Sequence, residues 1–223
     1  MKQLLTALLL LAAFATLRAA DPMLTSYSAS QCEGSLTPYP TDINPAVYPD
    51  SLTPVFINHV GRHGARYPAS AVNCMTMRRA LERADSAGTI TPAGRKLRQL
   101  NEYIITLSTD RWGSLDSLGM AEQRAIATRM FYNFGEAFSG GTVNATSSYS
   151  PRAIMSMYCF THQLDRMDNR INFVTTTGRM NSPIMRFFDL DTEFVEYKKQ
   201  GPWLEKYNEY VEQYCPTSAI DKV

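Results

Sequence analysis

Histidine and cysteine are scarce in this chain, and neither sign of charge is in excess. The 223 residues include three histidines and four cysteines, with 22 basic residues against 21 acidic ones. Such a balance argues against a protein that binds nucleic acid through a basic surface. No two cysteines have C-x-x-C spacing, so neither a zinc site nor a redox dithiol is predicted. Internal repeats and low-complexity tracts are also absent.

Long apolar runs are absent except at the N-terminus. Lys2 is followed by a mostly apolar run over Leu4–Leu17, which leads to the small residues Ala19 and Ala20. This pattern predicts a signal peptide over residues 1–20 and export to the periplasm, the medium or a secretory lumen. The run is too short to predict a stable membrane anchor, and a buried N-terminal helix is the alternative interpretation.

The predicted export bears on the oxidation state of the cysteines. Disulfides persist in oxidising compartments, so we expect disulfide bonding in an exported chain. The four cysteines admit three complete pairings, among which the sequence does not choose. They are Cys32, Cys74, Cys159 and Cys215.

The rest of the chain divides into a lead-in and a folded part. The apolar content of 44% is typical of a globular protein with a core. Residues 21–53 are rich in proline, serine and threonine, which predicts an extended lead-in. Residues 54–223 alternate strand and helix patterns, and this predicts an α/β fold with a mainly parallel sheet and flanking helices. The helical stretch near residues 75–140 predicts an inserted helical cap subdomain.

Local signals indicate where the elements begin and end. The apolar run Pro54–Val60 predicts a buried strand. Thr91 and Pro92 predict the N-cap and first residue of a helix. The other expected elements are a helix over 120–138, a strand over 142–148, a helix opening at Ser150-Pro151, a strand over 171–177, and two helices within 192–214 separated at Gly201-Pro202.

The junction after the first predicted strand is the most informative stretch. It reads G-R-H-G-A-R-Y-P over residues 61–68. Ligands of open parallel sheets bind beyond the carboxyl ends of the strands, which is where this loop is expected. We expect Gly61 and Gly64 to let the backbone bend sharply around the intervening histidine. A solvated surface loop is the alternative interpretation.

Phosphoryl chemistry suits the residues of this loop. His63 can act as a nucleophile if a hydrogen bond to one ring nitrogen fixes the tautomer and leaves the other nitrogen free. Arg62 and Arg66 flank it, and guanidinium groups stabilise the charge that spreads over phosphoryl oxygens in the transition state. Arginine also makes up sixteen of the 22 basic residues, and it is the residue suited to bidentate phosphate contact.

The string R-H-G-A-R-Y-P at 62–68 resembles the signature of the histidine acid phosphatases, the branch that includes phytases. The segment Ser147–Ser156 resembles the second arginine segment of that family, which implies that Arg152 joins the phosphate-binding arginines. A helix N-terminus at this position also favours an anion. The segment Ser182–Asp189 is similar to one in the multiple inositol polyphosphate phosphatases. The resemblance covers roughly residues 50–215.

The resemblance implies a phosphoglycerate-mutase-like fold and a phosphomonoester hydrolase. His63 would form a phosphohistidine that water hydrolyses, while Arg62, Arg66 and Arg152 bind the phosphoryl oxygens. The implied partner is a small phosphorylated substrate. It is either an inositol polyphosphate, such as phytate, or 2,3-bisphosphoglycerate. No metal and no organic cofactor are implied, because the arginines supply the positive charge. No oligomeric state is predicted.

One element of the family pattern is missing. The family carries a late His-Ala-Glu or His-Asp motif that protonates the leaving oxygen, and none of the three histidines here precedes such a carboxylate. We therefore expect the N-terminal part of a longer domain, truncated at the C-terminus, with the proton donor beyond Val223. His59 is interpreted as a core histidine, or alternatively as support for His63. His162 shares a helical face with Met155 and Cys159, and is interpreted as structural.

Two other classes of protein fit parts of the pattern. A catalytically silent phosphate-binding member of the family is favoured by the missing acid. The mutase branch of the superfamily shares Arg-His-Gly, but the signal peptide and the Tyr67-Pro68 continuation argue against it. The sequon at Asn144 falls within a predicted strand, so it receives little weight.

Overall fold

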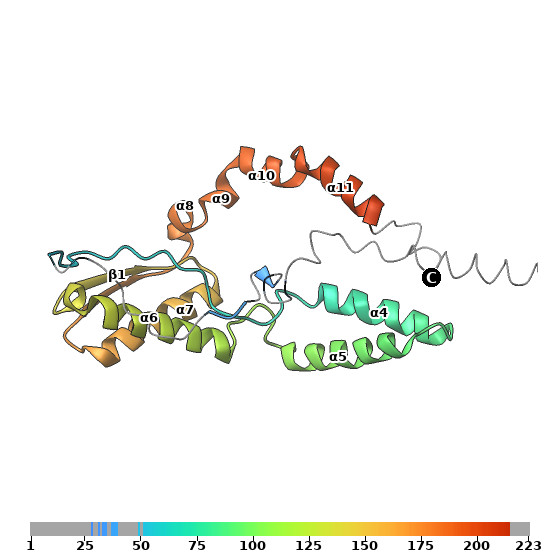
Figure 1. The fold of residues 1–223 in the computed structure, drawn as a ribbon, viewed down its shortest axis with the longest axis horizontal. Helices are drawn as coiled ribbons and strands as arrows, with labels where there is room; N and C mark the ends of the chain where they lie inside the picture. Colours follow the sequence, from blue (N-terminus) through green and yellow to red (C-terminus); the bar gives the residue numbers. More distant parts are fainter. Residues whose placement is uncertain are drawn as a thin grey trace, which may run out of the picture. The chain divides into compact units, whose positions relative to one another are not determined.

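The computed structural model describes residues 51–214, together with residues 28, 31, 33, 34, 37–39 and 49. The predicted signal peptide and most of the lead-in lie outside the described residues. The chain divides into two compact units, one over Pro38–Asp191 and one that includes the described residues from Thr192 onward. The elements, labelled as in Figure 1, are α4 (Val72–Ser86), α5 (Pro92–Ser108), α6 (Ser117–Phe138), β1 (Thr142–Thr146), α7 (Pro151–Met167), β2 (Asn172–Thr176), the 3-10 turn η2 (Arg179–Asn181), α8 (Ser182–Met185), α9 (Phe187–Leu190), α10 (Thr192–Gln200) and α11 (Trp203–Tyr214).

A parallel pair of strands forms the sheet of the first unit. β1 and β2 pair in parallel from Thr142 opposite Asn172 to Thr146 opposite Thr176. Helix α7 connects them, so the three elements form one βαβ unit. Both strands were predicted, and their parallel pairing beside the helices is compatible with the predicted α/β fold. Within the described residues the sheet has two strands.

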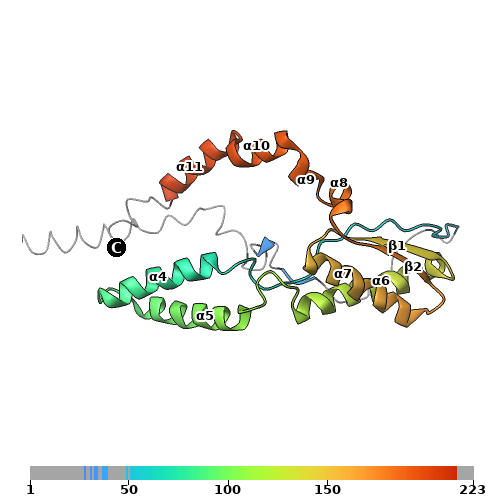
Figure 2. The same cartoon turned by 180° about the vertical axis from the view of Figure 1, so that it is seen from behind.

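The core lies between this sheet and two helices. Helices α6 and α7 cover the same face of the sheet (Figures 1 and 2). Ala127 and Phe138 of α6, Leu164 of α7, and Ile171 just before β2 are buried together. The predicted helix over 120–138 is therefore confirmed, and its apolar side packs as expected for an amphipathic helix.

The predicted buried strand over 54–60 is wrong. This segment runs alongside the sheet (Figures 1 and 2) but forms no strand. Val55, Phe56 and Val60 are 87%, 80% and 93% exposed, and only Ile57 packs against the core. In the described part of the chain β1 and β2 pair only with each other, and helices cover one face. Apolar side chains that alternate between two faces therefore cannot all be buried here.

Helices α4 and α5 form an antiparallel hairpin. Thr91 accepts a hydrogen bond from the Gly94 N–H at 3.0 Å and Pro92 occupies the first turn, as predicted. Charged pairs join the two helices, and Arg78 Nε donates to Glu102 Oε1 at 2.6 Å. The third helix of the predicted 75–140 insert, α6, packs on α7. The predicted cap subdomain is therefore limited to α4 and α5, and for these two helices it stays a prediction.

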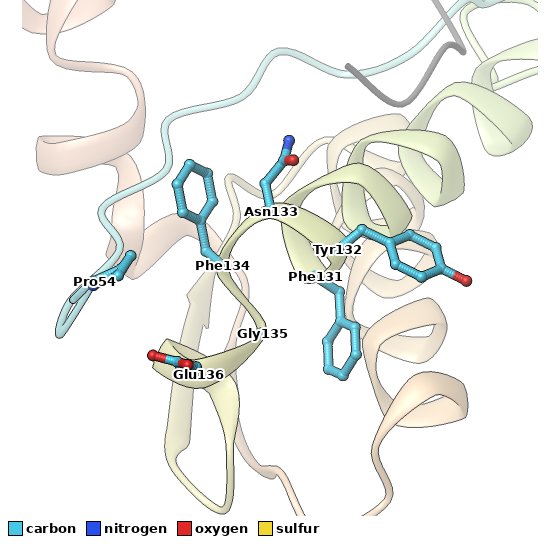
Figure 3. Close-up of a pocket in the computed structure, with 7 residues that line it drawn as sticks. All are labelled: Pro54, Phe131, Tyr132, Asn133, Phe134, Gly135 and Glu136. Atoms are coloured by element: carbon cyan, nitrogen blue, oxygen red, sulfur yellow. The ribbon is translucent and has the colours of Figure 1, made fainter. Parts of the chain in front are cut away.

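Helix α6 is kinked near its end. Phe134 has a non-helical backbone, with φ of −139° and ψ of 32°. A pocket of about 370 Å³ opens beside the kink (Figure 3). None of the residues that line it belongs to the predicted phosphate site, so this pocket is not the candidate active site. They are Pro54, Phe131, Tyr132, Asn133, Phe134, Gly135 and Glu136.

The second unit contains α10 and α11. Helix α10 ends, and α11 begins, at the break that was predicted at Gly201-Pro202. The Gly201 N–H and the Trp203 Nε1–H both donate to the Tyr197 carbonyl, each at 2.8 Å. A Cβ on Gly201 would lie 2.6 Å from the Trp203 ring, so only glycine fits this corner. No helix of the described chain is both long and apolar enough to cross a membrane.

Two of the four cysteines are described. Cys74 and Cys159 carry free thiols, and they are not bonded to each other. Cys32 and Cys215 lie outside the described residues. Disulfide formation therefore stays a prediction.

The position of Leu164 allows a direct test of the core. Leu164 is fully buried between α6 and the sheet, so Leu164→Ala should lower the free energy of unfolding by about 2–5 kcal/mol. Leu100 on α5 is 50% exposed, and Leu100→Ala is the matched control, expected within about 0.5 kcal/mol of the parent. Urea denaturation followed by circular dichroism measures both. Equal effects of the two substitutions would contradict this description of the core.

Candidate active site

The loop at residues 61–68, called the histidine loop below, is fixed by the connection between α5 and α6. The Tyr67 N–H donates to the Ser114 carbonyl at 3.0 Å, and the Gly113 N–H donates to the Pro68 carbonyl at 2.7 Å. The Asp116 N–H donates to the Ala65 carbonyl at 3.1 Å. These backbone contacts hold the histidine loop in place, although the residues before it form no strand.

Gly64 is required for close packing rather than for a sharp bend. Neither Gly61 nor Gly64 has a positive φ, so neither position uses the left-handed conformation that glycine allows. Instead the Gly64 backbone lies against Gly119 at the start of α6, and a Cβ on Gly64 would come within 2.6 Å of the Gly119 Cα. The loop reaches the helix only because both positions lack a side chain.

His63 is held in one tautomer by its own loop. Its Nδ1 lies 2.8 Å from the Gly64 carbonyl oxygen. A carbonyl can only accept, so Nδ1 carries the proton and Nε2 of the neutral ring keeps its lone pair. Partial burial lowers the pKa of His63 below 6.5, and the charges of Arg152, Arg62 and Arg66 lower that pKa further. The opposing hydrogen bond to Gly64 does not reverse this direction. The neutral, nucleophilic form is therefore favoured.

The three predicted arginines come together around this histidine. The charge of each one acts on His63, and Arg62 and Arg66 also contribute to the lowered pKa of Arg152, for which burial is the larger cause. None of the three forms an ion pair within the described part of the chain. The Nε atoms of Arg66 and Arg152 are buried without a hydrogen-bond partner among the described residues. The three arginines therefore offer more hydrogen-bond donors and positive charge than the described residues around them accept or neutralise.

Arg152 owes its position to the strand, loop and helix that were predicted around it. β1 ends at Thr146, and α7 opens with Ser150 as N-cap and Pro151 in the first turn. Ser150 Oγ is also buried without a partner among the described residues. The amide of Asn181, which follows β2, donates to the Ser147 carbonyl at 2.9 Å. The loops beyond both strands are therefore tied together at the carboxyl edge of the sheet.

The third motif segment adds positive charge beside Arg152. The charge of Arg186 contributes to the lowered pKa of Arg152. The guanidinium groups of Arg186 and Arg179 both lie over the Tyr149 ring, with centroid distances of 5.4 and 4.7 Å. Unlike the first three arginines, Arg186 has a carboxylate partner, Asp189. The positive region thus extends from the histidine loop towards α8.

Sequence reasoning missed three residues that contact the histidine loop. Glu122 accepts from the Ala65 N–H, Gln123 donates to the Arg62 carbonyl, and Ser156 accepts from the Gly64 N–H. All three side chains belong to buried residues. A signal existed for Glu122, because it continues the helical stripe of Ile126 and Met130 at four-residue spacing. A carboxylate on an apolar stripe indicates a buried partner.

The two other histidines are His59, before the histidine loop, and His162, on α7. The ring of His59 stacks on Phe160 of α7 at 5.2 Å, but His59 is exposed and is not part of the core. His162 is exposed on α7, whereas Cys159 on the same face is buried. The interpretation of His59 as a core histidine is therefore wrong, whereas the structural interpretation of His162 is not tested. Neither of them hydrogen-bonds His63 within the described residues.

The electrostatic description of His63 can be tested by removing one charge. Arg152→Gln should raise the pKa of His63 towards 6.5, because the protonated ring no longer meets the charge of Arg152. The pKa should stay below 6.5, since burial is the largest cause of its lowering. A ¹⁵N NMR pH titration of the imidazole rings measures it. Arg166→Gln, about 20 Å along α7 at 1.5 Å per residue, is the matched control. An unchanged His63 titration in Arg152→Gln would contradict the proximity of the two groups.

The structure thus brings Arg62, His63, Arg66 and Arg152 together, with Arg186 beside them. Their side chains come from the histidine loop, the first turn of α7 and the turn after α8. In comparisons with known proteins, the chain matches no family model and no curated protein.

Proposed function

We propose that this chain carries the nucleophile and phosphate-binding arginines of a phosphomonoester hydrolase of the histidine acid phosphatase type. One observation carries the proposal. His63 presents an unprotonated Nε2, fixed by the Nδ1 hydrogen bond to Gly64, among three arginines without carboxylate partners in the described chain. A nucleophile for phosphorus and a binding site for phosphoryl oxygens are the two components that this reaction requires.

The charge distribution supports a phosphate ester as the substrate. The Nε donors of Arg66 and Arg152 are buried without partners among the described residues, and such donors favour an anion that accepts several hydrogen bonds at once. A phosphoryl group offers three equatorial oxygens. Arg152 also lies in the first turn of α7, where the positive end of the helix dipole favours an anion. The arginines can supply the charge stabilisation that other phosphatases obtain from metal ions, so the proposed reaction needs no cofactor.

The proposed reaction has two steps. The His63 Nε2 lone pair attacks phosphorus, the bond from phosphorus to the ester oxygen breaks, and the leaving alkoxide takes a proton from a general acid. Water then attacks the phosphohistidine, the nitrogen–phosphorus bond breaks, and inorganic phosphate and neutral His63 are released. Arg62, Arg66 and Arg152 stabilise the charge in both transition states.

The general acid is the component that the described residues do not supply. Two carboxylates contact the histidine loop region, and both are occupied as acceptors. Glu122 accepts from the N–H groups of Ala65 and Tyr39, while Asp116 accepts from the Gly119 N–H as the N-cap of α6. The family resemblance assigns this role to a His-Ala-Glu or His-Asp motif, which none of the three histidines here forms.

The substrate class and the finer fold are part of the same proposal. Arg186 extends the positive region beyond the three arginines, which supports a substrate with several phosphates, such as an inositol polyphosphate or 2,3-bisphosphoglycerate. The helices flanking one face of a parallel sheet are compatible with a phosphoglycerate-mutase-like fold in which α4 and α5 form the cap. The apolar run near Lys2 supports export of the protein.

A second candidate is a phosphate-binding member of the family without turnover. The occupied carboxylates of Glu122 and Asp116 favour it, because they leave the described site without a free proton donor. The two candidates share the phosphate site and differ only in whether a phosphohistidine forms. Trapping that intermediate separates them.

The nucleophile can be identified chemically. Acid-sensitive, base-stable label should appear on His63 when the chain is mixed with ³²P-labelled p-nitrophenyl phosphate and quenched in base. His63→Ala should abolish the label, while His162→Ala on exposed α7 should retain it. Peptide mapping by mass spectrometry locates the phosphate. Label on a serine or an aspartate would exclude the proposed mechanism, and phosphate binding without label would favour the silent binder.

The missing acid predicts a dependence on the leaving group. A positioned general acid contributes about a hundred- to ten-thousand-fold, and p-nitrophenolate needs that help far less than an alkoxide. The chain should therefore hydrolyse p-nitrophenyl phosphate weakly and inositol hexakisphosphate almost not at all. Phosphate release is measured on protein whose fold is verified by circular dichroism and thermal melting. Comparable rates on the two esters would place the acid within this chain, with carboxylates near the histidine loop as first candidates.

A further inference from the structure

Two neighbouring residues of α6 bind the backbone on both sides of His63. Glu122 Oε2 accepts from the Ala65 N–H at 2.7 Å, two residues after the histidine. Gln123 Nε2 donates to the Arg62 carbonyl at 3.2 Å, one residue before it. Both residues are buried, at 7% and 6% exposure, so water does not compete effectively for these bonds.

Glu122 also holds a third segment. Its other oxygen, Oε1, accepts from the Tyr39 N–H at 3.0 Å. The Tyr39 ring lies under the Arg129 guanidinium, 4.7 Å from the ring centroid, so the same residue is held on α6 twice. A single carboxylate therefore joins Tyr39 of the lead-in, the histidine loop and the helix.

We propose that Glu122 and Gln123 are positioning residues, which fix the direction of the His63 ring and the spacing of its flanking arginines. The role in catalysis rests on the proposed phosphatase function, whereas the effect on His63 itself does not. With Arg62 and Ala65 fastened to one rigid helix, the chain between them has little freedom to rotate. The Nδ1 hydrogen bond to Gly64 depends on that backbone, and it sets which nitrogen faces the substrate.

A carboxylate is the side chain that this position requires. Glu122 meets two N–H donors from two directions and offers one acceptor oxygen to each. A glutamine would have one acceptor oxygen and one NH₂ group, so one buried N–H would face another donor. Glu122→Gln keeps the shape of the side chain but breaks one of the two bonds. Gln123→Met likewise keeps the length of the side chain but removes its amide group, and with it the Nε2 donor to Arg62.

The experiment uses both variants in the whole chain, with Glu136→Gln as the matched control. Glu136 is exposed and lies on the same helix, but it does not contact the histidine loop. Thermal melting first identifies variants that remain folded. The ¹⁵N shifts of the His63 ring then report its tautomer, and calorimetric titration with inorganic phosphate reports the arginine site. Turnover of p-nitrophenyl phosphate gives kcat and KM separately.

We expect His63 in both variants to lose its single Nδ1–H tautomer and to show averaged ring shifts. We expect kcat on p-nitrophenyl phosphate to fall by about ten- to a hundredfold with a smaller change in KM, since misplacement by about 1 Å can cost a hundredfold. Glu136→Gln should match the parent in every measurement.

Unchanged His63 shifts in two folded variants would overturn the proposal, whatever the activity. If Glu122→Gln does not fold, the shifts of Gln123→Met decide alone, because that substitution removes one hydrogen bond at the edge of the loop. Failure of the phosphatase function has a different result. In that case the parent would neither bind phosphate nor release it, while the tautomer of His63 would still respond to Glu122→Gln.

Discussion

The contact between the histidine loop and the start of α6 is the constraint on which the site depends. Gly64 and Gly119 approach so closely that neither tolerates a Cβ. This approach brings Glu122 and Gln123 within hydrogen-bond distance of the loop and lets Ser156 of α7 reach the Gly64 N–H. The loop thus takes its geometry from two helices that are themselves held by the core. Leu164 and Ala127 keep those helices together, so the site and the core are mechanically linked.

The electrostatics of the site oppose folding and favour ligand binding. Three cations surround a histidine, and within the described chain no carboxylate pairs with them. Positive groups that are partly buried without partners cost stability, which is tolerated where a ligand later compensates for the charge. The same charges keep the pKa of His63 low, and a low pKa keeps the ring neutral. The same arginines therefore favour the binding of an anion and keep His63 in the neutral form that can attack phosphorus.

Local sequence patterns were sufficient for most elements and for the residues that meet at the site. Thr91-Pro92 and Ser150-Pro151 mark helix starts because capping and proline act within one turn. The motif at 62–66 was singled out because its residue types suit phosphate, whereas Arg152 was assigned through the resemblance of Ser147–Ser156 to a segment of the histidine acid phosphatases. The errors involve longer range. Burial of 54–60 depends on neighbouring strands, the role of Gly64 depends on a residue in another element, and Glu122 meets partners 57 and 83 residues away. None of these partners lies close enough in the sequence for a local pattern to reveal it.

The exposure of the 54–60 segment has a consequence for how the site is held. A loop that follows a strand usually inherits its position from the hydrogen bonds of that strand, yet residues 54–60 form no strand in the described fold. The histidine loop is nevertheless fixed, because its bonds go forward to residues 113–116 and to α6 and α7. Ile57, which packs against the core, and His59, which stacks on Phe160, tie the preceding segment to the rest of the unit. The geometry of His63 therefore does not require a strand at residues 54–60, since the hydrogen bonds that hold its loop come from residues 113–116 and from α6 and α7.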